Sequence, residues 1–156
     1  AVGTLRKAPG LFGAFAFMPA EIKSYLLNFS SPQIYTTTLP EAHAASALDV
    51  LEIVAQSECQ QRQLAQLSQW LKTELSEAGF RVSGDAHILS VEIGKERSAV
   101  AMARSLLSKG IFVLPARYPT VPLNKAILRI SLTALHTKAD GRTLMEALKA
   151  SHESST

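Results

Sequence analysis

GTLRKAPGLFG, from Gly3 to Gly13, is the stretch of sequence that points most directly to a fold and to a chemistry. Its glycines, at positions 3, 10 and 13, allow tight turns and a close approach of the backbone to a ligand. Lys7 follows Thr4 by three residues. A lysine amine can form a Schiff base, and a threonine hydroxyl can donate a hydrogen bond to an anion. These groups could hold an aldehyde cofactor and its phosphate, although a glycine-rich surface loop with a solvated lysine has the same pattern.

GTLRKAPG resembles the cofactor-lysine segment of the α-oxoamine synthases, which are pyridoxal-phosphate enzymes of the aspartate-aminotransferase fold (type I). The resemblance implies that Lys7 is catalytic and carries pyridoxal 5'-phosphate as a Schiff base, and that Thr4 contacts the cofactor phosphate. Arg6 stands where the family usually has Ser or Gly, and Pro9 where it usually has a larger apolar residue. Neither difference removes a reacting group.

The segment IYTTTLP, from Ile34 to Pro40, contains three consecutive threonines, which favour an extended backbone or a solvated strand end. It resembles a family motif whose hydroxyl reaches across a dimer interface to the phosphate of the partner's cofactor. The resemblance implies that Thr37, or second to it Thr36, binds the cofactor in a homodimer of the full-length protein.

A second group of candidate residues lies in ARYPTVPLN, from Ala116 to Asn124, and in the following ILRISL. Two prolines flank Thr120 and Val121 and stiffen the loop by fixing φ. Arg129 lies among apolar residues on a predicted strand. It is either a partly exposed arginine on an edge strand or a buried or cleft-facing guanidinium that grips a carboxylate bidentately.

ARYPTVPLNKAILRISLTALHT resembles the pattern of one group within the family, the 8-amino-7-oxononanoate synthases of biotin biosynthesis. This implies that Arg129 binds the carboxylate of the amino-acid substrate and that Thr120 contacts substrate. The implied reaction condenses L-alanine with a pimeloyl thioester, with decarboxylation. Tyr118, Asn124 and Ile127 depart from this pattern, where the group has a proline, a glycine and a basic residue. An α-oxoamine synthase with a different amino acid or acyl chain, and a non-catalytic α/β binding module, are the alternatives.

Hydrophobic spacing predicts an alternation of strands and helices, and so an α/β fold. The predicted helices span residues 20–28, 41–56, 57–78 (with Ser57 as N-cap), 98–109 and 138–150, and the predicted strands span residues 13–18, 80–82, 87–93, 111–114 and 128–132. We expect the strand 13–18 to be buried and the last six residues to fray. The resemblance implies that residues 1–56 end the large cofactor domain, with a long connecting helix. Residues 57–156 would form the small C-terminal domain, a mostly antiparallel sheet with helices on one face.

Several side chains have structural interpretations. Leu64, Leu67, Leu71 and Leu75 form a core stripe, and Val100, Ala103, Leu106 and Leu107 are predicted to face inward. We expect His43 and His152 at the surface, His87 packed on its strand, and His136 in a capping or structural role near the last helix.

Composition excludes other classes of function. The net charge is +3 and the basic residues are scattered, which argues against a nucleic-acid partner. Cys59 is the only cysteine, so no disulfide forms within the chain, which fits a reducing, cytoplasmic location. No apolar run reaches the roughly 18–20 residues of a membrane helix, and no His/Cys cluster has metal-site spacing.

Ala1 and Val2 precede the glycine-rich turn without a methionine, and the resemblance covers well under half of a family member. We therefore expect a C-terminal fragment, inactive alone, in which the part after Ser57 folds independently.

Overall fold

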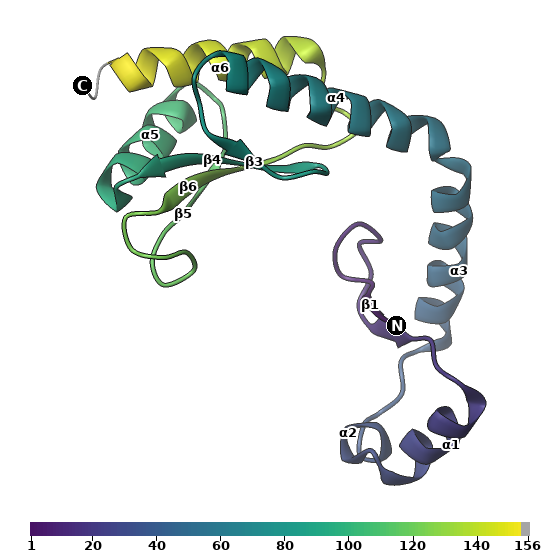
Figure 1. Ribbon diagram of the computed structural model, residues 1–156. Helices are drawn as coiled ribbons and strands as arrows, with labels where there is room; N and C mark the ends of the chain where they lie inside the picture. Colours follow the sequence, from purple (N-terminus) through teal and green to yellow (C-terminus); the bar gives the residue numbers. More distant parts are fainter. Residues whose placement is uncertain (154–156) are drawn as a thin grey trace. The chain divides into compact units, whose positions relative to one another are not determined.

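The computed structural model describes residues 1–153, and the side chains of residues 1–151. The chain forms two compact units, Ala1–Glu58 and the residues from Cys59 onward (Figure 1). Each unit is described by itself.

The first unit begins with a two-stranded antiparallel sheet of β1 (Val2–Thr4) and β2 (Ala14–Ala16), in which Gly3 lies opposite Phe15. The backbone N–H of Leu5 donates to the carbonyl of Gly13 at 3.0 Å, which closes the loop between the strands. Strand β2 lies within the predicted strand, but Phe15 and Phe17 are 41% and 71% exposed. The predicted burial of this strand is therefore not seen, because the sheet to which β2 belongs has only two strands.

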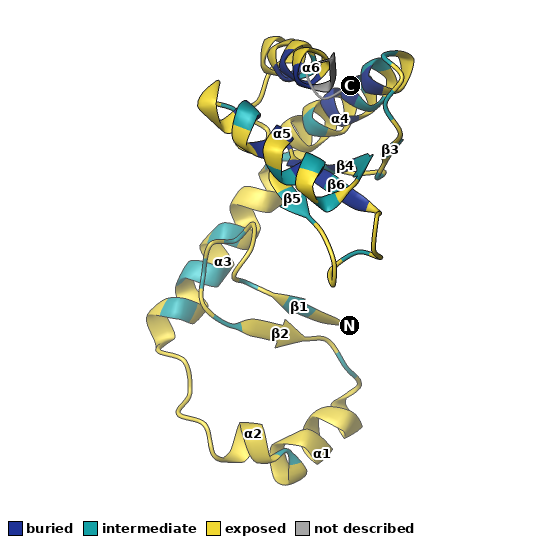
Figure 2. Ribbon diagram, turned by 90° about the vertical axis from the view of Figure 1, so that its left-hand side faces the viewer, coloured by how far each residue is buried: buried dark blue, intermediate teal, exposed yellow. Residues whose placement is uncertain are grey.

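Three helices complete the first unit: α1 (Ala20–Phe29), α2 (Ser31–Ile34) and α3 (Glu41–Gln56). The prediction for α3 is confirmed at both ends, and α1 runs one residue further than predicted. Ile34 ends α2, and the backbone from Thr36 to Pro40 is irregular, so the predicted extended segment forms no strand. Among residues 1–58, all of which the structure describes, none is buried (Figure 2). This unit therefore has no hydrophobic core of its own.

The second unit is a four-stranded sheet of order β3-β4-β6-β5 with every neighbouring pair antiparallel. Its strands are β3 (Val82–Ser83), β4 (Ile88–Gly94), β5 (Leu114–Ala116) and β6 (Ala126–Ser131). Helices α4 (Glu58–Glu77), α5 (Glu96–Ser108) and α6 (Lys138–Glu153) lie on one side of the sheet (Figures 1 and 2). The predicted architecture of a small antiparallel sheet with helices on one face is confirmed.

The core of the second unit lies between the helices and one face of the sheet. Side chains alternate along a strand, so Leu89 and Val91 of β4 are fully buried while Ser90 between them is half-buried. The predicted stripe on α4 is confirmed, because Leu71 and Leu75 are fully buried. Within the described residues of the second unit, no helix covers the opposite face of the sheet, here called the open face (Figure 1).

Helix α5 and the strand after it differ from the prediction. The buried positions of α5 are Ala99, Met102, Ala103 and Leu106. Leu107 is 56% exposed, because it lies about 100° around the helix from Leu106. The backbone N–H of Ile111 still donates to Leu106, as part of the turn at Gly110 that ends the helix, so β5 begins at Leu114 instead of residue 111.

Two serines also behave differently from the prediction. The Ser57 hydroxyl donates to the Ile53 carbonyl at 2.6 Å, so it serves the end of α3 instead of capping the next helix. Ser151 is buried within α6, where its hydroxyl donates to the Ala147 carbonyl at 2.8 Å. The predicted fraying is therefore wrong for residues 151–153, and residues 154–156 lie outside the described residues.

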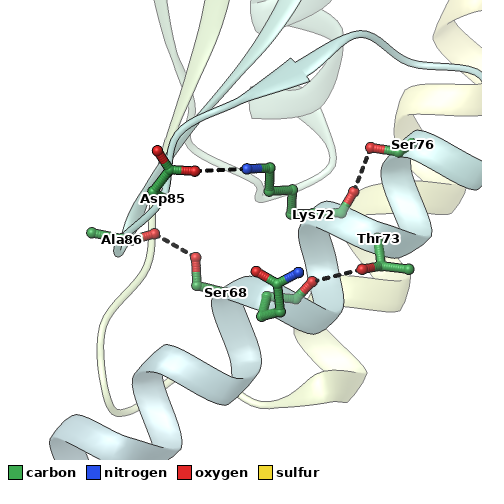
Figure 3. Close-up of polar contacts among 7 residues, drawn as sticks. Ser68, Lys72, Thr73, Ser76, Asp85 and Ala86 are labelled. Carbon is green, nitrogen blue, oxygen red and sulfur yellow. Dashed lines mark hydrogen bonds and ion pairs between the residues drawn. The ribbon is translucent and has the colours of Figure 1, made fainter.

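Polar contacts tie α4 to the turn that precedes β4 (Figure 3). The buried Ser68 hydroxyl donates to the Ala86 carbonyl, and Lys72 Nζ lies 2.8 Å from Asp85 Oδ1. The Lys72 ammonium lowers the pKa of the Asp85 carboxyl, through a hydrogen bond and through its charge. These contacts fix the start of β4.

Candidate functional site

The loop after β1 presents the candidate Schiff-base lysine. Thr4 ends β1, and Lys7 lies in the turn that follows, where the N–H of Gly10 donates to the Lys7 carbonyl at 3.0 Å. Gly10 has a φ of 66°, a left-handed conformation that favours glycine. Both Thr4 and Lys7 are exposed. The turn therefore presents an amine and a hydroxyl at the end of one strand.

Among the described residues, the Thr4 hydroxyl makes only long hydrogen bonds. It donates to the Gly13 carbonyl at 3.5 Å and accepts from the Arg6 N–H at 3.3 Å. Both distances exceed those of strong hydrogen bonds. The hydroxyl can therefore exchange its donor bond for one to an anion at low cost.

Two glycines of the stretch lie in close contact with neighbouring side chains. A Cβ on Gly3 would lie 2.3 Å from the Phe15 ring, and a Cβ on Gly13 would lie 2.9 Å from Cδ1 of Leu39. Leu39 follows the threonine segment directly, so it packs the end of that segment beside the Lys7 loop. A Cβ at either position would force the Phe15 ring or the Leu39 side chain to move.

Arg6, which departs from the family pattern, stacks on an aromatic ring. Its guanidinium carbon lies 4.5 Å from the centroid of the Phe12 ring, and that ring meets the His43 ring edge-on at 6.5 Å. His43 is half-buried, so the expected surface residue is only partly exposed. A small residue at position 6 would make no such stack, so Arg6 adds a cation–π contact to the loop.

Thr36 and Thr37 lie in the irregular segment before Pro40, and both are exposed. The Thr36 hydroxyl donates to the Thr37 carbonyl at 3.3 Å. Among the described contacts, neither hydroxyl bonds to Thr4 or Lys7. Their role across a dimer interface stays a prediction.

Arg129 lies at the centre of the open face of the sheet. On β6 it pairs with Ser90 of β4 on one side and with Leu114 of β5 on the other. It is exposed and on an internal strand, so it is neither an edge-strand arginine nor buried. Within the described residues no carboxylate pairs with it. Its guanidinium is therefore free to donate hydrogen bonds to a carboxylate of a ligand.

Thr120 lies in the β5–β6 loop, residues 117–125, and is exposed. Its N–H donates to the Arg117 carbonyl at 2.9 Å, and the bond between Tyr118 and Pro119 is cis. Asn124 has a φ of 59°. The expected glycine at this position is therefore replaced by the residue type that best tolerates left-handed backbone after glycine.

The candidate residues fall into two sets. Thr4, Lys7 and the two threonines Thr36 and Thr37 belong to the first unit. Arg129 and Thr120 belong to the second unit. Sequence reasoning missed Glu92 and Glu96, which contact the loop that carries Thr120. The only signal in the sequence was the unexpected asparagine at position 124.

The remaining histidines have no part in these sets. His87 is exposed in the bend before β4, so its predicted packing is wrong. His136 accepts the Thr133 N–H at its Nδ1 at 2.9 Å, which confirms a structural role before α6. The position of the His152 side chain lies outside what the structure describes.

A cavity of about 520 Å³ lies on the helix side of the second unit. Leu67, Leu144, His136 and Asp140 are among its lining residues, and none of the candidate site residues lines it. Within residues 1–153 there is no group of three or more His, Cys, Asp or Glu side chains that could hold a metal ion. In the same part of the chain, every helix is too short or too polar to cross a membrane.

Comparison with known proteins places these features in a family. Residues 1–148 match the model of the family described as aminotransferase class I and II. The chain is 40% identical over 157 residues to the 8-amino-7-oxononanoate synthase of Cupriavidus taiwanensis, a match that covers 96% of this chain and 39% of that protein. The chain thus spans about two fifths of the length of this curated relative.

Solved structures show the same fold. The 8-amino-7-oxononanoate synthase of Francisella tularensis superposes with a TM-score of 0.86 at 27% identity, over 99% of this chain and 45% of that one. A variant of serine palmitoyltransferase from S. paucimobilis, with a bound PLP–myriocin aldimine, superposes with a TM-score of 0.85 at 27% identity. The match covers 98% of this chain and 39% of that one. From its family match and its fold, this chain belongs to the class I and II aminotransferase family.

Proposed function

We propose that this chain is the C-terminal part of a pyridoxal-phosphate-dependent acyltransferase that condenses L-alanine with a pimeloyl thioester, releases carbon dioxide and forms 8-amino-7-oxononanoate. The observation that carries the proposal is the similarity to 8-amino-7-oxononanoate synthase along nearly the whole chain, including both candidate motifs. The full-length protein would act in the cytoplasm as a homodimer.

The residues of the first unit fit the cofactor. Lys7 supplies an exposed amine for the Schiff base, and the weakly bonded Thr4 hydroxyl supplies a donor for the phosphate. The glycines at positions 3 and 13 let Phe15 and Leu39 pack against the loop that carries both groups. Thr37, or second to it Thr36, would donate to the phosphate bound by the partner subunit.

The residues of the second unit fit the substrates. Arg129 would bind the alanine carboxylate, since its planar guanidinium is exposed and has no acidic partner among the described residues. Thr120 would contact substrate from a loop that its prolines stiffen. Pyridoxal phosphate, when bound, supplies the electron-withdrawing ring that stabilises the carbanion formed when carbon dioxide leaves. Lys7 would hold the cofactor through its side-chain amine.

A substrate panel on the full-length protein that contains this chain tests the proposal. We expect turnover with alanine and a pimeloyl thioester, measured as thiol release and as product mass, to exceed turnover with glycine or serine. Preference for serine with a long acyl thioester would instead support a second candidate, an enzyme similar to the solved serine palmitoyltransferase. Absence of a visible Schiff-base absorbance with added cofactor would overturn both.

A further inference from the structure

The loop that carries Thr120 has internal turns that hold its shape. Besides the turn at Thr120, the Lys125 N–H donates to the Pro122 carbonyl at 3.1 Å. Such bonds connect neighbouring residues of the loop only. The position of the loop against the sheet therefore depends on contacts with other elements.

One such contact comes from the first residue of α5. Glu96 Oε1 accepts the backbone N–H of Asn124 at 2.8 Å, across 28 residues of sequence. This hydrogen bond is the main reason that the pKa of Glu96 is lowered. The φ of 59° at Asn124 belongs to the same backbone arrangement. The chain also passes close by at Gly94, where a Cβ would lie 3.7 Å from the Asn124 carbonyl oxygen.

A second carboxylate holds the next residue of the loop. Lys125 Nζ lies 3.1 Å from Glu92 Oε1 on β4, and Arg81 lies 3.2 Å from the same oxygen. The Glu92 side chain is only 24% exposed, so it is more shielded than either cation. Two carboxylates from the end of β4 and the start of α5 therefore contact consecutive residues, 124 and 125.

We infer that Glu96 is a positioning residue that fixes the C-terminal end of the Thr120 loop through the Asn124 N–H, with Glu92 as a second anchor through Lys125. Pro119 and Pro122 limit the internal freedom of the loop, so fixing one end also restricts where Thr120 can lie. The part of this inference that concerns substrate rests on the proposed function. The part that concerns the loop does not.

Amide hydrogen exchange on this chain tests the anchor directly. We expect Glu96→Ala to raise the exchange rate at Asn124 by about tenfold, the effect of losing a hydrogen bond to a charged acceptor. Glu96→Gln keeps an acceptor oxygen and should restore much of the protection. Glu146→Ala, which removes an exposed carboxylate from α6, is the control and should leave the exchange rate at Asn124 unchanged. Equal exchange in the Glu96→Ala and unaltered chains would overturn the anchor.

Steady-state kinetics of the full-length protein test the consequence for substrate. We expect Glu96→Ala to raise KM for alanine or the pimeloyl thioester several-fold, with smaller change in kcat and the same cofactor absorbance, and Glu96→Gln to recover most of the loss. Faster exchange at Asn124 with unchanged KM values would overturn the substrate role. If the unaltered enzyme does not turn over these substrates, the proposed function fails, and the exchange measurement still decides whether Glu96 holds the loop.

Discussion

At the scale of single residues, Lys7 has the most specific predicted role. We expect borohydride reduction of the full-length protein with pyridoxal phosphate to fix a pyridoxyl group on Lys7, because its amine lies in the glycine-rich turn beside Thr4. Peptide mapping by mass spectrometry locates the label. Lys23 of α1, an exposed lysine in the same unit, serves as the internal control. A label on Lys23, or on any lysine other than Lys7, would contradict the assignment.

Arg129 is the second residue whose role can be measured. Arg129→Leu should raise KM for the amino acid roughly ten- to hundredfold, since a hydrogen bond to a charged group contributes about 1.5–3 kcal/mol. The KM of Arg129→Lys should lie between those of the unaltered enzyme and Arg129→Leu, because lysine keeps the charge and loses the bidentate geometry. The matched control is Arg104→Leu on the exposed side of α5. An unchanged KM in Arg129→Leu would exclude a role in carboxylate binding.

At the scale of elements, α6 packs closely on α4 through Gly141. A Cβ on Gly141 would lie 2.6 Å from the Trp70 ring, and Trp70 Nε1 donates to Glu74 at 3.0 Å, which holds the ring in place. Gly141→Ala should therefore lower the free energy of unfolding by about 1–2 kcal/mol, since overpacking of about 1–3 kcal/mol exceeds a helix-propensity gain of up to about 1 kcal/mol. Denaturant unfolding measures this. In a Trp70→Phe background, where the ring is smaller, Gly141→Ala should become neutral or stabilising. The same loss in both backgrounds would show that the ring is not the cause.

The start of α6 also gives a pH dependence. Asp140 Oδ2 accepts the Thr137 N–H at 2.7 Å and the Thr137 hydroxyl at 2.8 Å, and these bonds lower the pKa of the Asp140 carboxyl. A lowered pKa in the folded state stabilises the fold above the usual aspartate pKa of about 3.9, and this stabilisation is lost as the pH falls through the folded-state value. The Tm difference between the unaltered chain and Asp140→Asn should thus be constant near neutral pH and shrink below about pH 4. Glu146→Gln should show no such trend, and a constant difference down to pH 2 for Asp140→Asn would contradict the role of the charge.

At the scale of the whole molecule, the two units differ in how they are stabilised. The second unit has a buried core from three helices and a sheet, whereas no residue among 1–58 is buried. Limited proteolysis of this chain should cut first before about Pro40, and the part after Ser57 should resist, because cleavage follows local opening. Mass spectrometry of early fragments identifies the sites. Uniform resistance along the chain, with Schiff-base formation on added cofactor, would show that the chain is a functional unit by itself.

The sequence alone determined five of the helices and most of the strands, because these depend on short-range patterns, but it did not predict the short helix α2. Leu67, Leu71 and Leu75 predict a helix face by their spacing, and Leu89 and Val91 predict a strand face by alternation. The motif around Lys7 likewise lies within a few residues of sequence. Its resemblance indicated the family, which the comparisons confirm.

Only the tertiary structure decided features that depend on contacts between distant residues. Arg129 proved to be on an internal strand because β6 pairs with both β4 and β5, which hydrophobic alternation cannot show. The turn that ends α5 includes Ile111, whose N–H donates to the Leu106 carbonyl. Strand β5 therefore begins three residues later than predicted, because the capping hydrogen bonds override local propensity. Glu96 and Asn124 are 28 residues apart, and their hydrogen bond exists only because α5 begins beside the β5–β6 loop.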